Sequence, residues 1–180
     1  MEFLECVKTR RSIRNFKEEK LPKEMIEDCV AVASLSPSWK NSQIVRYYYT
    51  DNEEIMNIIG ENHVLNFTFN TNTIKNAAGI MILSMIPNRS GYEKDGSFST
   101  PKEDRFEMFD AGIASQTFCL AATEKGIGTV VLGYFEEDSI KKLLDIPAEH
   151  KIACVIAMGY PDEKPEPSKR KSVEELLVIR

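Results

Sequence analysis

The sequence predicts one mixed α/β or α+β domain followed by a short C-terminal arm. Segments with helical spacing of apolar residues alternate with short, continuous apolar runs, a pattern typical of helices that alternate with buried strands. Near the C-terminus, the prolines of DEKPEPSKR exclude a helix and its charges exclude a core, which predicts an extended linker. At 180 residues the chain suits one compact domain with room for a ligand pocket, and no internal repeat divides it.

The beginning of the sequence predicts two helices. Apolar residues recur at helical spacing in MEFLECVKTR, so a first short helix is expected to end where the arginines begin. In LPKEMIEDCVAVASLSPS, Pro22 stands at a helix start, and Ser36 and Pro37 stop the helix. The apolar face expected between them consists of Met25, Ile26, Cys29, Val30 and Ala33.

Two strands are expected next, with a helix between them. Residues 44–50, IVRYYYT, are rich in the β-branched and aromatic side chains that favour strands. The apolar run at 77–86, AAGIMILSMI, ends at Pro87 and suits a strand buried on both faces. Thr50 or Asp51 is expected to cap the intervening helix, because a glutamate follows each at the capping-box spacing.

A long loop and a long helix follow. The loop PNRSGYEKDGSFSTPKED mixes glycine, proline, serine and charge, and its length is typical of a lid, a binding loop or a disordered segment. From Asp104 to Lys125 a stripe of residues recurs every three or four positions, which predicts an amphipathic helix with Gly126 as its stop. That stripe consists of Phe106, Phe109, Ile113, Thr117 and Leu120.

The last part of the domain predicts two more strands and a helix. TVVLGY and IACVIAMGY are further candidates for buried strands, and the short segment EDSIKKLLDI between them is helical in character. Beyond the linker, SVEELLVI is expected to form a last small element, for which Ser172 and Glu175 supply a capping box.

The composition limits the kind of partner. With 23 lysines and arginines against 28 aspartates and glutamates, the formal net charge is -5, which disfavours nucleic acid and anionic membranes. No apolar run approaches the ~20 residues of a membrane span, and the N-terminus lacks the basic-then-apolar order of a signal peptide. A cytoplasmic enzyme or binding protein is therefore expected.

Cysteines and histidines give no sign of a metal site. The four cysteines lack CxxC spacing and mostly have apolar neighbours, so we expect buried thiols in a reducing compartment at Cys6, Cys29, Cys119 and Cys154. His63 and His150 are far apart in sequence and poorly accompanied by other ligands. Each is expected to be an ordinary surface or cap residue.

Three features of the sequence are suited to bind anions. They are the arginine segment Arg10, Arg11, Ser12 and Arg14, the polar turn SPSWKNSQ, and the basic cluster Lys169, Arg170 and Lys171. Forked guanidinium donors and a hydroxyl favour a phosphate, so the three regions would form a site for a phosphorylated cofactor if they converge. Each also has a simpler interpretation: cations that stabilise a helix C-terminus, residues common in any loop, and a solvated basic surface.

Several other classes of site are excluded. GIGTVVLG does not have the glycine spacing of a dinucleotide-binding GxGxxG turn, and no GxxxxGK[ST] phosphate loop occurs. No GxSxG elbow is present, and two histidines leave little material for a Ser-His-Asp triad. Nucleophilic hydrolysis is therefore not expected.

Four motifs resemble those of the FMN-dependent nitroreductase family, in the family's order and spacing. TRRSIRNF is similar to its phosphate-binding Arg-Arg-Ser-x-Arg-x-Phe, and SPSWKNSQ resembles its Pro-Ser-x-x-Asn-x-Gln turn. DAGIASQTFCLAATEKGIGTVVLGYF is similar to its central helix, glycine turn and strand, and KRKSVEELL resembles its C-terminal basic motif. Together these motifs span nearly the whole chain.

This resemblance implies a fold and an assembly. The fold is an α+β, three-layer α-β-α sandwich around a mixed, mainly antiparallel sheet, assembled as an intertwined homodimer with FMN at the subunit interface. Residues 1–162 would form the FMN-binding domain, and residues 163–180 an arm that packs on the partner subunit. The flavin chemistry would need no catalytic side chain, and no metal is implied.

The resemblance also assigns site residues. The flavin phosphate and ribityl region would contact Arg10, Arg11, Ser12 and Arg14, with Lys169 and Arg170 completing the anion site. The partner chain would present Pro37, Ser38, Asn41 and Gln43 to the flavin ring, and Leu132 and Gly133 would lie against that ring. Two departures from the family pattern bear on this assignment: Ile44-Val45 replaces a common Pro-Trp, and Ser168 stands where a tail lysine is usual.

The implied activity is an NAD(P)H oxidoreductase. Reduced nicotinamide would give hydride to the flavin and be replaced on the same face by an electron-poor acceptor such as a nitroaromatic or a quinone, in ping-pong order. The alternatives are a non-catalytic flavin-binding or storage protein, and a specialised flavin enzyme for reductive dehalogenation or flavin fragmentation. No motif separates NADH from NADPH or names the acceptor. Trp39 is either a pocket wall or an ordinary turn aromatic.

Overall fold

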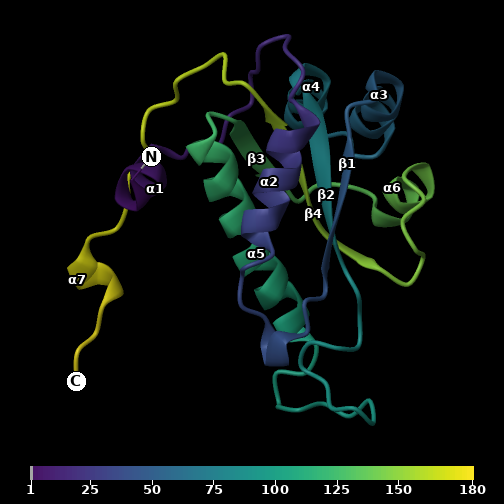
Figure 1. Cartoon of the computed structure of the whole chain (residues 1–180), viewed down its shortest axis with the longest axis vertical. Helices are drawn as coiled ribbons and strands as arrows, with labels where there is room; N and C mark the ends of the chain where they lie inside the picture. Colours follow the sequence, from purple (N-terminus) through teal and green to yellow (C-terminus); the bar gives the residue numbers. More distant parts are fainter. Residues whose placement is uncertain (1) are drawn as a thin grey trace.

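A computed structural model describes residues 2–180 and shows an antiparallel four-stranded sheet (Figure 1). Its strands lie in the order β1-β2-β4-β3, and each adjacent pair is antiparallel. A single parallel bridge joins Ser12 to Thr129 of β3, beside the edge of the sheet. The strands are β1 (Val45–Thr50), β2 (Gly79–Met85), β3 (Gly128–Leu132) and β4 (Lys151–Gly159).

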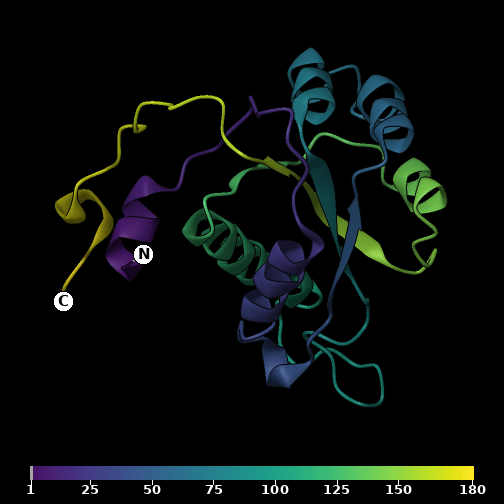
Figure 2. The same ribbon diagram turned by 45° about the horizontal axis from the view of Figure 1, so that its top comes forward.

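Helices cover both faces of this sheet, which confirms the three-layer α+β sandwich. Figures 1 and 2 show two helices on one side, α2 (Lys23–Ala33) and α5 (Arg105–Glu124). The other side carries α3 (Glu53–Asn62), α4 (Thr68–Asn76) and α6 (Glu137–Leu143). The remaining short helices are α1 (Phe3–Thr9), the 3₁₀ helix η1 (Trp39–Asn41) and α7 (Val173–Leu176).

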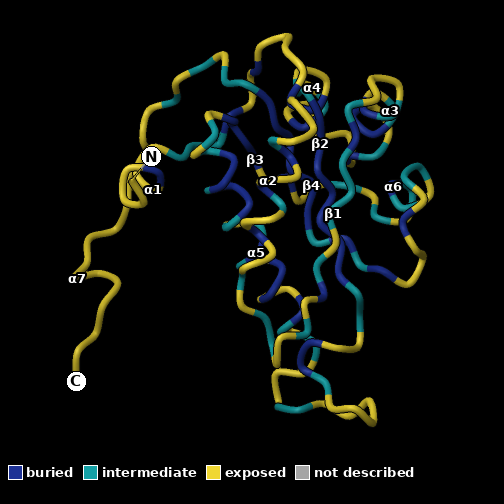
Figure 3. The backbone as a smooth tube through the Cα atoms, in the orientation of Figure 1, coloured by how far each residue is buried: buried dark blue, intermediate teal, exposed yellow. Residues whose placement is uncertain are grey.

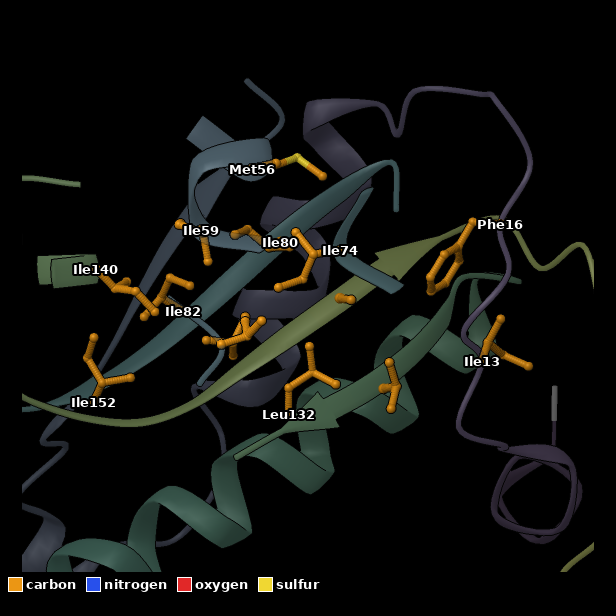
Figure 4. Close-up of a cluster of buried hydrophobic side chains, with 14 of the residues drawn as sticks. Ile13, Phe16, Met56, Ile59, Ile74, Ile80, Ile82, Leu132, Ile140 and Ile152 are labelled. Atoms are coloured by element: carbon orange, nitrogen blue, oxygen red, sulfur yellow. The ribbon is translucent and has the colours of Figure 1, made fainter. Parts of the chain in front are cut away.

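The central strands are buried on both faces, as the apolar run at 77–86 predicts. All seven residues of β2 are buried. One face packs into a cluster with α3, α4 and α6, shown in Figure 4, and the other packs against α2 and α5. The strands are antiparallel even though both faces are covered, so burial by itself does not imply a parallel sheet.

The cap of α3 differs from the expected one. Asn52 is the N-cap: its side-chain Oδ1 accepts hydrogen bonds from the backbone N–H groups of Glu54 at 3.0 Å and Ile55 at 3.2 Å. The prediction of Thr50 or Asp51 was wrong because β1 extends through Thr50 and the chain needs two more residues to turn. Thr50 instead accepts a hydrogen bond from the N–H of Asn52.

The long helix α5 is confirmed, but its buried face is not the predicted stripe. Phe109 of that stripe is 62 % exposed. The buried face includes Glu107, Asp110, Ala111, Ala114 and Phe118. Apolar side chains occur on more than one side of this helix, so their spacing establishes a helix without establishing which side faces the sheet. Gly126, with φ of 77°, ends the helical segment as predicted.

Both histidines and all four cysteines can be located. His63 is the C-cap of α3, in agreement with the prediction. His150 was wrongly predicted as a surface or cap residue: it is 8 % exposed, and its Nδ1 lies 3.0 Å from the Oγ of buried Ser84. Its partner Ser84 lies on β2, 66 positions away in sequence, so the residues around His150 do not reveal this contact. The cysteines are free and buried, as predicted.

The C-terminal arm leaves the body of the molecule. No helix or strand forms between 163 and 172, and α7 begins with the predicted capping box of Ser172 and Glu175. Residues 167–180 are exposed, and Figure 3 shows them as a continuous exposed segment. Among the described residues, no helix combines the length and the apolar character needed to cross a membrane.

Candidate functional site

The arginine segment is attached to the edge of the sheet. After α1 ends at Thr9, the N–H of Ile13 donates a 3.0 Å hydrogen bond to the carbonyl of Thr129 in β3. Close contact is possible because Gly128 has no side chain: a Cβ there would lie 2.8–3.0 Å from Ile13 atoms. The arginines on either side of Ile13 are therefore held beside β3.

The arginine segment and the arm together line one pocket of about 490 Å³. Five of its residues carry positive charge and one, Glu166, carries negative charge. The predicted residues in its lining are Arg10, Arg11, Ser12, Arg14 and Arg170. Lys169 is exposed and is not part of the lining, whereas its neighbour Ser168 is. On an acidic chain, this pocket is a local concentration of cations.

The guanidinium groups have different local partners. Arg11 donates from Nη1 to the carbonyls of Lys8 at 2.7 Å and Arg10 at 2.8 Å, so it caps the C-terminus of α1. The helix-end interpretation therefore holds for Arg11. Arg14 donates to the carbonyl of Ser12 at 3.3 Å. No ion pair between described residues involves these arginines, which leaves donors available for an anion.

Glu163 connects the start of the arm to the arginine segment. Its carboxylate accepts hydrogen bonds from the backbone N–H groups of Arg14 at 2.5 Å and Asn15 at 3.1 Å, and from the Asn15 side chain at 2.9 Å. Partial burial is the largest single influence and raises the pKa of Glu163, but these hydrogen bonds and the Arg14 charge together lower the pKa below its ordinary value. These hydrogen bonds therefore favour the ionised carboxylate of Glu163.

The end of β3 offers an open backbone surface. Leu132 is 5 % exposed and its side chain belongs to the core, so only its backbone can face a ligand. A Cβ at Gly133 would have no atom within 4 Å. Leu132 lies three residues beyond Thr129, or about 10 Å along a strand. Gly133 and the cationic pocket therefore lie along the same edge strand.

An aromatic cluster adjoins this open backbone, and sequence reasoning missed it. Phe67 lies 5.6 Å from Phe69 and 5.4 Å from Tyr134 between ring centroids. Phe69 is 70 % exposed and Tyr134 is 59 % exposed. The signal in the sequence is weak: two phenylalanines alternate with polar residues at 66–70, and a tyrosine directly follows Gly133.

The polar turn forms a second candidate region. Pro37, Ser38 and Gln43 line a pocket of about 240 Å³ together with residues of α2, β1 and α5, but Asn41 does not. The Ser38 hydroxyl accepts a 3.0 Å hydrogen bond from the Gln43 N–H, so it stabilises the turn itself. Trp39 is a turn aromatic whose ring centroid lies 4.2 Å from that of Phe106.

The polar turn and the arginine segment lie at opposite ends of α5 (Figure 1). Asp110, near the start of α5, binds the N–H of Trp39. The arginine segment instead lines a pocket with Gly126 and Gly128, beyond the end of the same helix. The 14 steps along α5 from Asp110 to Glu124 correspond to about 21 Å of helix, so the two regions of one chain do not meet. Within one copy, the arginine segment meets the basic cluster at Arg170, but the polar turn does not join them.

These features define an α+β sandwich protein with a candidate site for an anionic ligand at its sheet edge. Comparison with known proteins gives the family: the model of the nitroreductase family matches residues 7–160, and the chain belongs to that family. No group of three or more metal-binding side chains is arranged to hold a metal ion among residues 2–180.

Relatives in the family carry names of different activities. A protein of Methanothermobacter thermautotrophicus named "Putative NADH dehydrogenase/NAD(P)H nitroreductase" is 31% identical over 170 residues, which cover 92% of this chain and 80% of the relative. The iodotyrosine deiodinase of Thermotoga neapolitana is 26% identical over 171 residues, which cover 91% of this chain and 90% of the relative.

Solved structures share the fold. A nitroreductase family protein from Clostridium novyi NT has 27% sequence identity and a TM-score of 0.79, and the match covers 92% of this chain and 89% of that chain. A "putative nitroreductase in complex with FMN" from Exiguobacterium sibiricum has a TM-score of 0.85 at 20% identity, with 100% of this chain and 98% of that chain covered.

Proposed function

We propose that this chain is an FMN-dependent NAD(P)H oxidoreductase that reduces electron-poor acceptors such as nitroaromatics or quinones. The observation that carries the proposal is the arrangement along β3: a cation-lined pocket at Ser12 and an open glycine at Gly133, in a member of the nitroreductase family. A phosphorylated flavin has an anionic end and a flat ring, and these two features suit those two places.

The donors in the pocket fit the flavin phosphate. The phosphate would be bound by the Ser12 hydroxyl and by the guanidinium groups of Arg10, Arg11, Arg14 and Arg170, and Lys169 adds positive charge nearby. The backbone of Leu132 and Gly133 would lie against the ring. Pro37, Ser38, Asn41 and Gln43 would come from a second copy, a proposal supported by their separation from the arginines within one chain.

When bound, FMN supplies the redox chemistry by accepting hydride from NADH or NADPH and passing electrons to the acceptor. The protein's contribution is placement and electrostatics. Arg10 and Arg14 anchor the phosphate, and backbone donors and positive charge near the ring stabilise negative charge there. Tyr134 directly follows Gly133, and Phe69 is joined to it through the Phe67 ring; these exposed rings form an aromatic wall against which a flat acceptor can stack.

We further propose a homodimer in which residues 1–162 form the flavin-binding domain and residues 163–180 pack on the partner. Large exposed apolar side chains support a second copy as the covering partner, on α1, α5 and the arm: Phe3, Leu4, Phe109, Leu176, Val178 and Ile179. Sedimentation at micromolar concentration is expected to show a dimer, and a monomer would contradict this assembly.

Four free, buried thiols favour a location in the cytoplasm, because disulfides are rare in that reducing compartment.

The experiment that tests the activity is anaerobic spectroscopy of the purified protein. We expect a yellow protein that NADH or NADPH bleaches and that a nitroaromatic recolours. A colourless protein that cannot be reconstituted with FMN would overturn the proposal. Yellow protein that neither nicotinamide reduces would favour flavin storage or a specialised reaction. Dehalogenation of iodotyrosine by the reduced protein, in preference to nitroaromatic reduction, would assign it the activity named in its Thermotoga relative.

A further inference from the structure

Asp110 is a buried carboxyl group that binds two separate segments at once. It belongs to the buried side of α5, and the residue is 3 % exposed. It accepts hydrogen bonds from the Trp39 N–H at 3.1 and 3.2 Å and from the Ser42 hydroxyl at 3.4 Å, both in the polar turn. It also accepts a 2.6 Å hydrogen bond from Ser90, which is fully buried in the 87–104 loop.

The polar turn needs such a restraint. Lys40, Asn41 and Gln43 have φ values of 46°, 55° and 46°, in the left-handed region that residues other than glycine disfavour. Within the turn, Ser38 accepts from the Gln43 N–H, and no other side chain of the turn binds its backbone in this way. The buried carboxylate of Asp110 connects the middle of the turn to α5, and a 2.9 Å hydrogen bond from the Ser36 hydroxyl to Thr117 connects its start.

The turn and the 87–104 loop are also joined directly. The Lys40 ammonium lies 2.7 Å from the Glu93 carboxylate, and the Trp39 ring packs on Phe106, at the start of α5 after the loop. These contacts are more exposed than the contact at Asp110. The two segments therefore share one buried hydrogen-bond centre and an outer ion pair.

We infer that Asp110 is a positioning residue for the flavin ring, acting through the polar turn and coupling it to the 87–104 loop. The inference rests on the proposed function, in which the turn contacts the ring in the partner's site. The Asp110 of one copy would then position the polar turn of that copy against the flavin bound by the partner. A conformational change in the 87–104 loop would shift Ser90 and Asp110, and through them the turn that contacts the ring.

Glu107 provides a matched control. It is one turn earlier on α5 and is 1 % exposed, so it is equally buried. Its carboxylate accepts from the Asn88 N–H at 2.7 Å and pairs with Lys151 at 2.7 Å, but it binds no residue of the polar turn. Glu107→Gln therefore disturbs a buried carboxylate of the same helix without removing a contact to the turn.

The first measurement needs no flavin, because Trp39 is the only tryptophan in the chain and lies in the turn. The backbone N–H of Trp39 is shared by both carboxylate oxygens of Asp110, and in Asp110→Asn one of them becomes an NH₂ donor and the other a neutral acceptor. The Trp39 emission should therefore shift, and the backbone N–H of Trp39 should exchange faster. In Glu107→Gln both should stay close to wild type. Unchanged emission and exchange in Asp110→Asn would overturn the inference.

The second measurement tests the effect on the flavin. FMN affinity should fall by about tenfold or more in Asp110→Asn, the loss expected for hydrogen bonds to a charged group, and the absorption bands of bound flavin should shift. Glu107→Gln should change affinity by less than about twofold. Equal losses in both variants, or none in Asp110→Asn, would overturn the assignment.

The two proposals can fail separately. Wild-type protein that takes up no FMN defeats the proposed function, whereas the Trp39 measurements still decide whether Asp110 holds the turn. If Asp110→Asn does not fold, amide exchange in wild-type protein keeps the test: a Trp39 N–H that exchanges at the rate of an unprotected amide contradicts the restraint. Ser90→Ala then tests the coupling, and a Trp39 emission identical to wild type would contradict it.

Discussion

The backbone N–H of Ile13 donates a 3.0 Å hydrogen bond to the carbonyl of Thr129. This contact joins residues 116 positions apart and places the arginine segment beside β3. Cations that follow a helix in sequence thereby become the wall of a pocket whose other wall is the C-terminal arm.

Arg10→Ala and Arg14→Ala should each weaken FMN retention by about tenfold or more, because each removes a charge-assisted donor to the phosphate. Fluorescence titration of apo-protein with FMN measures this. Arg105→Ala, an exposed arginine outside the pocket, is the control and should bind as wild type. Unchanged affinity in both pocket variants would mean that the phosphate lies elsewhere.

Substitution by alanine should have different effects at Gly128, in β3, and at Gly133, directly after β3. Gly128→Ala places a Cβ 2.8–3.0 Å from the stiff, branched Ile13 side chain, so it should lower the free energy of unfolding by about 1–3 kcal/mol. Gly133→Ala meets no atom within 4 Å and should leave the melting temperature unchanged while weakening FMN binding. Thermal melting and flavin titration of the pair check this, and a Gly133→Ala protein with wild-type affinity would place the ring elsewhere.

The hydrogen bonds of Glu163 should make stability depend on pH in the acid range. Because the folded-state pKa of Glu163 is lowered, its contribution is fully present above the unfolded pKa of about 4.3 and is lost as pH falls through the folded pKa. The melting temperature of wild type should exceed that of Glu163→Gln by a constant amount between about pH 6 and 8, and this difference should vanish in more acidic buffer. A difference that persists under those conditions would rule out the carboxylate as its origin.

Asn52→Ala should destabilise the protein by about 1 kcal/mol, because it removes the acceptor for two N–H groups at the start of α3. Asp51→Ala is the neighbouring control and should cost less than about 0.5 kcal/mol. Denaturant unfolding of both variants measures the difference. If Asp51→Ala lowered the free energy of unfolding more than Asn52→Ala, Asp51 would be the N-cap, as the spacing in the sequence predicted.

Most of the secondary structure could be predicted from the sequence because its signals are local. The apolar run of β2, the glycine after α5 and the capping box at Ser172 each depend on residues a few positions apart. The cap of α3 and the burial of His150 could not be predicted, since one depends on where β1 ends and the other involves a contact with Ser84, 66 positions away. The buried carboxyl groups of α5 were missed because their donors lie 19 to 71 residues away.

By itself, the sequence determined the identity and order of most elements, though not the separate helix α4. It also determined the four free thiols and the types of residue that could bind a phosphate, because side-chain chemistry and short-range spacing suffice for these. Only the tertiary structure decided which of those residues meet. Arg14 and Arg170 line one pocket because the chain returns along the sheet edge through Glu163, whereas Gln43 lines another pocket, beside the first half of α5. Such contacts join residues far apart in sequence, and a local sequence pattern does not specify which distant residues come together in space.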